Sequence, residues 1–410
     1  MMPTARRDRQ APDGEDPSAG TRGRAMRMMM MLVFFTLFLA TLGLISWYLF
    51  IRGLAALPRG SALRRPYIVL FWFLTLSFVG GRVFENLLPS PPATILIWIG
   101  SFWLGAVVYL LLAALTVDLL RLVHRFLPFF PAAVTRDLAR AKLATLATVL
   151  AATALCLAGG YVNSLFPVVR TLDIEVARRC GGMESLDIVA ASDIHLGTIV
   201  GRARLDGIVD RINRLHPDIV LLPGDIVDED LAPVIRQDLG AAIENIRSRF
   251  GTYAVTGNHE YIGGVEEAAA YLRAHGVTLL RDEKVRIGDA FHLVGREDRS
   301  IGRFTGLRRK GLDALMDGID DGCPVILLDH QPFELEEAAR HGVTLQLSGH
   351  THYGQLWPLH LVVRMLYEVP WGYRRSGDTH YYVSCGVGTW GPPLRIGNRP
   401  EIVRIRLHFP

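Results

Sequence analysis

Residues 186–197 read LDIVAASDIHLG, an apolar run that ends in Asp193 and His195. The same arrangement returns four times, as DIVLLPGDIVD at 218–228, TYAVTGNHE at 252–260, PVILLDHQP at 324–332 and VTLQLSGHTH at 343–352. Short apolar runs rich in β-branched residues are typical of buried strands. Ligand sites in layered α/β folds gather at the carboxyl ends of strands, so we expect these five loops to meet in space.

The five loops carry carboxylate, amide and imidazole groups but no thiolate. They supply Asp193, His195, Asp225, Asp228, Asn258, His259, His330, His350 and His352. Ligands of this kind suit divalent or trivalent Mn, Fe or Zn ions better than Cu(I). Seven candidate ligands exceed the needs of one catalytic ion with an open position, so they indicate two ions about 3.5–4 Å apart. Such a pair activates water as hydroxide and offsets charge on phosphoryl oxygens.

In this order, DIH, GDIVD, GNHE, the histidine of LDHQP and GHTH resemble the motif series of calcineurin-like metallophosphoesterases. The resemblance covers about residues 185–408. It includes the closing CGVGTWGPPLRIGNRPEIVRIRL, which is similar to the terminal strands of membrane-anchored or exported bacterial members. It implies an α/β four-layer (αββα) sandwich, with two sheets flanked by helices around a dinuclear metal centre.

The family pattern also implies a role for each residue. It assigns Asp193, His195 and His352 to the first ion, Asn258, His330 and His350 to the second, and Asp225 to a bridge between them. His259 would face the substrate phosphate, where it would stabilise charge or protonate the leaving group, and Asp228 would support it. Each motif alone is a weak signal, since two histidines in a loop are more often solvated turn residues. The ordered series of five favours the metal site.

The first 170 residues differ in texture, because they hold nearly all the long apolar runs of a 410-residue chain that is 50% hydrophobic. We expect four membrane spans, at 28–51, about 66–88, within 89–117 and about 143–160, each near the ~20 residues that cross a bilayer. The predicted organisation is a disordered tail at 1–25, a four-helix transmembrane domain at 26–165, a linker at 166–184 and the metallophosphoesterase domain at 185–410.

The formal charge of +4 comes from arginines beside the apolar runs, which is typical of membrane flanks. Loops 52–65 and 118–142 are rich in arginine, so the positive-inside rule places them in the cytoplasm and the catalytic domain outside. Arg82 and Glu85, one helical turn apart in the second span, are expected to pair. Four cysteines without CxxC spacing predict isolated thiols rather than a disulfide framework.

Two functions from different classes fit the sequence. The first is a membrane-bound phosphoesterase acting on a phosphomonoester, phosphodiester or pyrophosphate, with a lipid-linked substrate as one candidate. The alternative is a membrane signalling or scaffold protein whose phosphoesterase-like domain only binds a phosphorylated ligand. No nucleic-acid partner is expected, because the second half lacks a long basic stripe. The oligomeric state stays open.

The stretch after GHTH, residues 356–371, is strongly apolar and has two interpretations. It is either a cover of the core or an interfacial element. The second interpretation places Trp357, Arg364, Tyr367 and Trp371 at the headgroups and Leu361, Val362, Val363 and Leu366 toward lipid.

Overall fold

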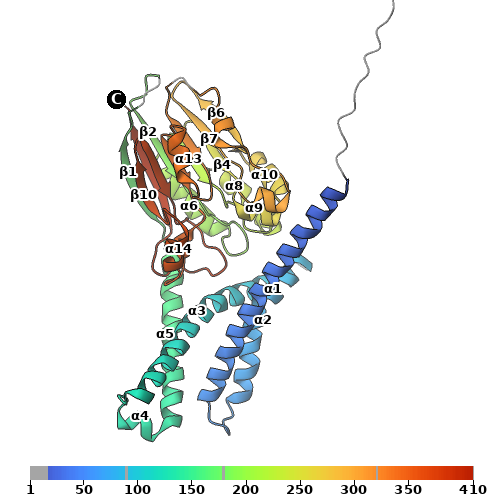
Figure 1. Ribbon diagram of the computed structural model, residues 1–410, viewed down its shortest axis with the longest axis vertical. Helices are drawn as coiled ribbons and strands as arrows, with labels where there is room; N and C mark the ends of the chain where they lie inside the picture. Colours follow the sequence, from blue (N-terminus) through green and yellow to red (C-terminus); the bar gives the residue numbers. More distant parts are fainter. Residues whose placement is uncertain (1–16, 88–90, 178–180, 320–321, 410) are drawn as a thin grey trace, which may run out of the picture.

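The computed structural model describes residues 17–87, 91–177, 181–319 and 322–409. Its first part is a group of long helices, and its second part is a two-sheet sandwich that sits on the ends of these helices (Figure 1). The helices of the first part are α1 Pro17–Ala56, α2 Arg64–Leu87, α3 Pro91–Phe126, the short α4 Ala132–Arg136 and α5 Leu138–Ser164.

Four of these helices are long and apolar enough to cross a bilayer, which confirms the four predicted spans. Their apolar stretches are Leu39–Ala56, Arg64–Glu85, Pro91–Phe126 and Leu138–Ser164. At 1.5 Å per residue, the shortest stretch, of 18 residues, reaches roughly 27 Å, close to the thickness of the hydrocarbon core. The chain is therefore a membrane protein. The α1–α2 turn and α4 lie at the end of the helices away from the sandwich, so both basic loops face away from it (Figure 1).

The structure shifts two of the predicted domain limits. Helix α1 begins at Pro17, so residues 17–25 are helical rather than part of a disordered tail, and residues 1–16 lie outside the described residues. Proline suits the first helical turn because its missing N–H would be unsatisfied there anyway. The expected linker contains the strand β1 Val168–Glu175, which pairs in parallel with β12 Glu401–His408. The sequence did not predict strand β1, because most of its residues are exposed and only Ile174 is buried.

The sandwich has two six-stranded sheets. The first has the order β1-β12-β2-β3-β4-β5, with β2 Ser185–Ala190, β3 Ile219–Pro223, β4 Thr252–Val255 and β5 Val277–Leu279. The second has the order β10-β11-β9-β8-β7-β6, with β6 Glu283–Ile287, β7 Phe291–Gly295, β8 Val325–Leu328, β9 Leu345–Ser348, β10 Gly372–Ser376 and β11 Thr379–Val383. Within the sheets β2, β3 and β4 are parallel, as are β7, β8, β9 and β11.

The helices of this domain are α6 Arg202–Arg214, α7 Ala232–Arg236, α8 Gly240–Ile243, α9 Asn258–Gly263, α10 Val265–Ala274, α11 Ile301–Phe304, α12 Leu312–Met316, α13 Leu335–Arg340, the 3-10 turn η1 His352–Gly354 and α14 His360–Leu366. Strand β3 explains why the strands are so apolar. Its Ile219 and Leu221 face the second sheet, whereas Val220 and Leu222 pack against α6, α8 and α10. Helices α12 and α13 cover the outer face of the second sheet. The predicted four-layer αββα sandwich is confirmed.

The loop of residues 392–398, which leads into the last strand, attaches the sandwich to the end of α5. The Asn163 side-chain amide donates to the carbonyls of Arg395, at 2.8 Å, and Asn398, at 2.7 Å. The Ser164 hydroxyl donates to the carbonyl of Pro393 at 3.0 Å. These bonds satisfy carbonyls of a loop that lies outside the named strands, and they hold the sandwich close to the membrane domain.

The cysteines depart from the prediction in one respect. Cys156 and Cys385 are free thiols, as expected, but Cys323 is disulfide-bonded. Spacing along the chain cannot reveal such a bond, because its geometry depends on residues brought together only by folding.

Candidate metal centre

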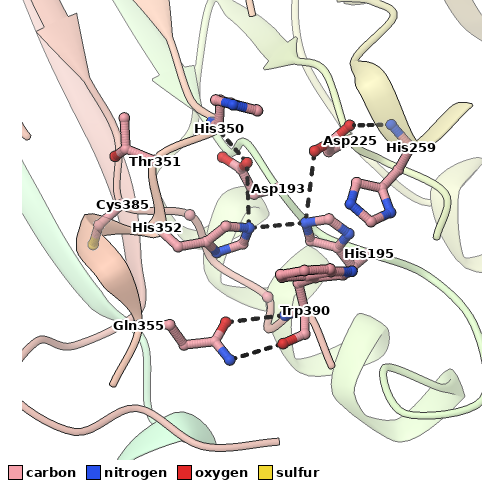
Figure 2. A network of polar contacts seen from close by, with 12 residues as sticks. Asp193, His195, Asp225, His259, His350, Thr351, His352, Gln355, Cys385 and Trp390 are labelled. Carbon is pink, nitrogen blue, oxygen red and sulfur yellow. Dashed lines mark hydrogen bonds and ion pairs between the residues drawn. The ribbon is translucent and has the colours of Figure 1, made fainter. Parts of the chain in front are cut away.

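The five motif-bearing loops leave the ends of β2, β3, β4, β8 and β9 and converge at one edge of the sandwich, as predicted. All nine predicted site residues meet there, and the structure describes each of them. Their side chains form two groups of ligand type and one supporting pair, described in turn below. Figure 2 shows the central part of this cluster.

Several residues of the site have a backbone conformation that non-glycine residues rarely adopt. Asp193, His195, Asp225, His350 and His352 have positive φ angles of 52°, 54°, 51°, 71° and 45°. Conformations of this kind cost of order 1–3 kcal/mol each and persist at sites where function requires them. Position 257 requires glycine for a different reason, because a Cβ there would collide with the side chain and the backbone nitrogen of Asp225. The backbone of these loops therefore directs the site side chains toward one another, and this conformation lowers the local stability of the loops.

The first group consists of Asp193, His195 and His352, whose ligand atoms lie within 4.8 Å of one another. The Nε2 atoms of the two histidines are 3.0 Å apart, and His352 Nε2 is 3.6 Å from Asp193 Oδ1 (Figure 2). The same carboxylate oxygen accepts the backbone N–H of His350 at 2.8 Å, whereas Asp193 Oδ2 is buried without a hydrogen-bond partner. The group thus leaves one oxygen and two imidazole nitrogens aimed at a common point.

The second group consists of Asp225, His330 and His350, together with Asn258. Asn258 Oδ1 lies 2.8 Å from His350 Nδ1 and 3.3 Å from His330 Nε2. Asp225 Oδ2 lies 3.1 Å from His330 Nε2 and 3.8 Å from His195 Nε2 of the first group. Asp225 therefore stands between the two groups, at the position of a shared ligand.

The supporting pair is His259 and Asp228. Asp228 Oδ1 lies 3.1 Å from His259 Nδ1 and 3.4 Å from His195 Nδ1. Burial lowers the pKa of His259, but the carboxylates of Asp225 and Asp228 outweigh it and raise this pKa to about 9. The indole of Trp390 meets the His259 ring edge to face, with 5.6 Å between centroids. The ring of His259 is thus held in place on two sides.

The donor set fits metal ions. Burial and the neighbouring His330 lower the pKa of His350 to about 3, which keeps this imidazole neutral, as a ligand must be. Burial raises the pKa of Asp225, but His330 and His259 hold it well below its ordinary value, so the carboxylate is ionised. Buried carboxylates and imidazoles that lack full hydrogen bonding, such as Asp193 Oδ2, are what divalent ions bind. The described residues therefore include groups able to hold metal.

Two buried residues that support the site escaped the sequence analysis. Glu260, 1% exposed, accepts four backbone N–H groups of the GDIVD and GNHE turns. A glutamate just inside a helix start is a capping signal that could have revealed it. Arg395, fully buried, donates to the carbonyls of His352, Gly386 and Gly388. No local signal marks Arg395, because its role depends on the carbonyl of His352, which is 43 residues away.

The membrane domain also reaches the site. Arg82 and Glu85 of α2 form the predicted pair, at 3.6 Å, yet each has a further partner in the sandwich. Arg82 Nη2 lies 3.4 Å from Asp228 Oδ2. Glu85, 3% exposed, accepts the hydroxyl proton of Thr198 and pairs with Arg236 at 3.3 Å. The end of a membrane span is thus in contact with two loops of the candidate metal centre.

The fold and the clustered ligands define a metallophosphoesterase domain carried on transmembrane helices. The family model described as calcineurin-like phosphoesterase matches residues 186–354. An uncharacterized metallophosphoesterase of Aquifex aeolicus is 34% identical over 251 residues, which cover 60% of this chain and 94% of that protein. The chain belongs to the calcineurin-like phosphoesterase family, as the motif series predicted.

Two further proteins are similar to parts of this chain. A bovine protein named transmembrane protein with metallophosphoesterase domain is 39% identical over 256 residues, which cover 59% of this chain and 57% of that protein. The chain thus spans little more than half the length of this relative. Among solved structures, a 5'-nucleotidase precursor from Thermus thermophilus aligns with a TM-score of 0.36 and 14% identity, over 55% of this chain and 54% of that one.

Proposed function

We propose that this protein is a membrane-bound phosphoesterase that uses two metal ions to hydrolyse a phosphomonoester, a phosphodiester or a pyrophosphate. The observation that carries the proposal is the position of Asp225, whose Oδ2 lies 3.1 Å from His330 Nε2 and 3.8 Å from His195 Nε2. A buried carboxylate between two groups of imidazole and carboxylate ligands suits a pair of Mn, Fe or Zn ions.

In this proposal the family roles apply residue by residue. The first ion would be held by Asp193, His195 and His352, the second by Asn258, His330 and His350, and Asp225 would contact both. When bound, the ions would supply a hydroxide nucleophile near neutral pH and offset the charge on phosphoryl oxygens.

His259 and Asp228 would serve the leaving group. The contact of 3.1 Å between His259 Nδ1 and Asp228 Oδ1 occupies one ring nitrogen and leaves Nε2 for the substrate. A protonated imidazole can donate its Nε2 proton to the leaving oxygen, and the Asp228 carboxylate favours that protonated form.

The substrate we propose is a phosphate carried by a lipid of the surrounding bilayer. Arg82, in an apolar span that ends at Glu85, lies 3.4 Å from Asp228 Oδ2, so the site is close to the membrane. A lipid keeps its phosphate at the headgroup level, where a site at the end of a span can reach it. Soluble phosphoesters are the competing substrate class.

We place the catalytic domain outside the cytoplasm. Both basic loops lie at the opposite end of the helices, and the positive-inside rule assigns such loops to the cytoplasm. The disulfide at Cys323 supports the same orientation, since disulfides persist in oxidising compartments. A cysteine introduced at the exposed Asp378 should react with an impermeant maleimide in intact cells. Labelling only after lysis would reverse the orientation.

The function is tested with the purified full chain supplied with Mn²⁺, using p-nitrophenyl phosphate and its bis-ester as substrates. We expect hydrolysis by the native protein, and a loss of about 10²–10⁴-fold in His259→Ala, the range of a general acid. His216→Ala, at an exposed histidine that is not among the candidate site residues, is the matched control and should retain full activity. Equal activity of the native and His259→Ala proteins would refute the mechanism, and metal analysis of the same samples would show whether two ions bind.

A further inference from the structure

Helix α14 directly follows the GHTH loop and exposes an unusual amount of apolar surface. Its Leu361, Val362, Met365 and Leu366 are 53, 51, 85 and 63% exposed, and the helix contains no buried residue. Trp357, just before the helix, is 53% exposed. These five side chains are called the α14 patch below. Contiguous apolar side chains on an otherwise ordinary sandwich mark an interaction surface.

The structure divides the segment between the two interpretations. Val369 is buried in the core on the outer face of the second sheet, whereas α14 contains no buried residue, and two members of the expected interfacial set are used elsewhere. The Trp371 indole N–H donates to the buried Glu401 at 3.0 Å. The ring of Tyr367 packs on Phe333, with 4.9 Å between centroids. Both side chains are therefore used inside the protein. Trp357 and Arg364 remain at the surface, beside the exposed leucines of the helix.

The α14 patch is continuous with the membrane domain. The backbone N–H of Trp357 donates to the carbonyl of Ile396 at 2.7 Å, and the N–H of Arg395 donates to the carbonyl of Gly160 in α5 at 3.0 Å. Two hydrogen bonds thus connect the start of the patch to a membrane span. Figure 1 shows α14 beside the sandwich-facing end of α5. A bilayer that surrounds α5 will also meet a surface attached to its end.

The segment that carries the patch is in contact with the metal centre at both ends. At its start, η1 contains His352, and the ring centroid of Tyr353 lies 5.6 Å from that of His360. At its far end, the ring of Tyr367 lies 6.0 Å from that of His350. One end of the segment therefore contains His352 and the other end contacts His350. The position of α14 relative to the lipid thus sets the distance of both histidines from the lipid.

We propose that the α14 patch inserts into the interfacial layer of the bilayer that the four helices span, and that it presents the metal centre to the phosphate headgroup of a lipid in that leaflet. The occupant is the lipid layer because the patch is attached by backbone hydrogen bonds to the end of the membrane span α5. Arg364, in the last turn of α14, can extend toward headgroup phosphates while its neighbours contact acyl chains. The second half of the proposal rests on the proposed function.

The first experiment measures insertion without any activity. Full-length protein in phosphatidylcholine vesicles is labelled with an environment-sensitive fluorophore at Met365→Cys, with Cys156 replaced by serine. The control is Asp378→Cys in the β10–β11 turn, at the opposite end of the sheet and 91% exposed. Lipids with a spin label on the acyl chain should quench the dye at position 365 several-fold more than at 378. Equal quenching at both positions would overturn the proposal.

The second experiment measures presentation of the lipid. Leu361→Glu combined with Leu366→Glu should lower the hydrolysis of phosphatidic acid in vesicles at least tenfold, and leave p-nitrophenyl phosphate hydrolysis within twofold. Unchanged thermal unfolding confirms that the variant is folded. Equal loss on both substrates would overturn presentation. Absence of hydrolysis in the native protein would defeat the proposed function, whereas the quenching result would still decide insertion.

A separate observation concerns Arg82 of α2. Its guanidinium lies 3.4 Å from Asp228 Oδ2, and the other oxygen of Asp228 lies 3.1 Å from His259 Nδ1 and 3.4 Å from His195 Nδ1. The neighbouring Glu85 accepts the hydroxyl of Thr198, three residues after His195. We infer that Arg82 is a positioning residue, supplied by a membrane helix, that orients Asp228 and through it both imidazoles.

A double-mutant cycle tests the role of Arg82. Arg82→Gln should lower kcat for p-nitrophenyl phosphate about tenfold and weaken Mn²⁺ binding, measured by electron paramagnetic resonance, several-fold. Arg82→Lys should restore part of both. In an Asp228→Asn background the Arg82 change should have little further effect, because the two act as one unit. The matched control is Arg52→Gln, which breaks an ion pair with Asp118. Additive losses, or losses equal to those of Arg52→Gln, would overturn the inference.

Discussion

Glu260 offers the sharpest test of how the site is built, since one buried carboxylate serves two metal-site loops. Its Oε1 accepts the N–H groups of Ile226 and Val227 at 2.7 and 2.9 Å. Its Oε2 accepts those of Gly257 and Asp225 at 2.7 and 3.2 Å. Substitution by alanine would leave four buried donors unpaired.

The magnitude follows from these four bonds. A buried donor without a partner costs about 1–3 kcal/mol, so Glu260→Ala should lower the free energy of unfolding by about 4 kcal/mol at the low end of that range. For a domain of this size, each kcal/mol shifts the midpoint by about 2–4 °C, which predicts a fall of about 8–16 °C. Glu260→Gln keeps one carbonyl oxygen for two of the four donors, so about half that fall is expected.

The assay is thermal unfolding of the full chain in detergent, followed by the fluorescence of the three tryptophans in the sandwich, Trp357, Trp371 and Trp390. Glu266→Ala is the matched control, because this glutamate is 73% exposed and forms only a surface pair with Arg281. Its loss should cost less than about 1 kcal/mol. A Glu260→Ala midpoint equal to that of the control would refute the view that these hydrogen bonds hold the loops together.

Three further predictions concern the metal, a glycine and pH. Addition of Mn²⁺ at about 100 times its Kd should stabilise the native state by about 2.7 kcal/mol, so a chelator should lower the unfolding midpoint reversibly; an unchanged midpoint would contradict metal binding by the folded site. Gly257→Ala should abolish Mn²⁺ binding, because its Cβ would displace the Asp225 carboxylate, and normal affinity would contradict that geometry. Partial burial raises the pKa of Asp187, but the hydrogen bond with Arg404 outweighs it and holds this pKa below its usual 3.8. The carboxylate therefore stabilises the fold above that pH, and the stabilisation is lost as pH falls through the folded pKa. Asp187→Asn should lower the midpoint by about 1–4 °C at pH 7, consistent with about 0.5–1 kcal/mol for a partly exposed pair, and the gap should close in acid.

The sequence predicted the loops of the site well because each follows a strand that is buried on both faces. Val220 and Leu222 face helices while Ile219 and Leu221 face the second sheet, so the run is apolar without interruption and its end is easy to see. The same logic predicted the four spans, whose length and apolar content are set by the bilayer rather than by tertiary contacts.

What the sequence did not reveal depends on partners that are distant in the chain. Strand β1 exposes Arg170, Thr171 and Asp173, so its alternation is weak, and only its pairing with β12 makes it a strand. The role of Arg395 depends on the carbonyl of His352, which is 43 residues away. The contact of Arg82 with Asp228 joins a membrane helix to a loop of the sandwich. The hydrophobic pattern of neither segment indicates that the two lie together. None of these features leaves a local signature.

The pairing of β1 with β12 also constrains the order in which the domain can fold. Arg170 and Glu401, joined by a 2.7 Å ion pair across these strands, are 231 positions apart. In the sheet order β12 separates β1 from β2, so β1 cannot join the sheet until β12, more than 200 residues further along the chain, has been synthesised. The first sheet can therefore be completed only after β12 has been synthesised, and loss of β12 would remove two strands from the sheet at once.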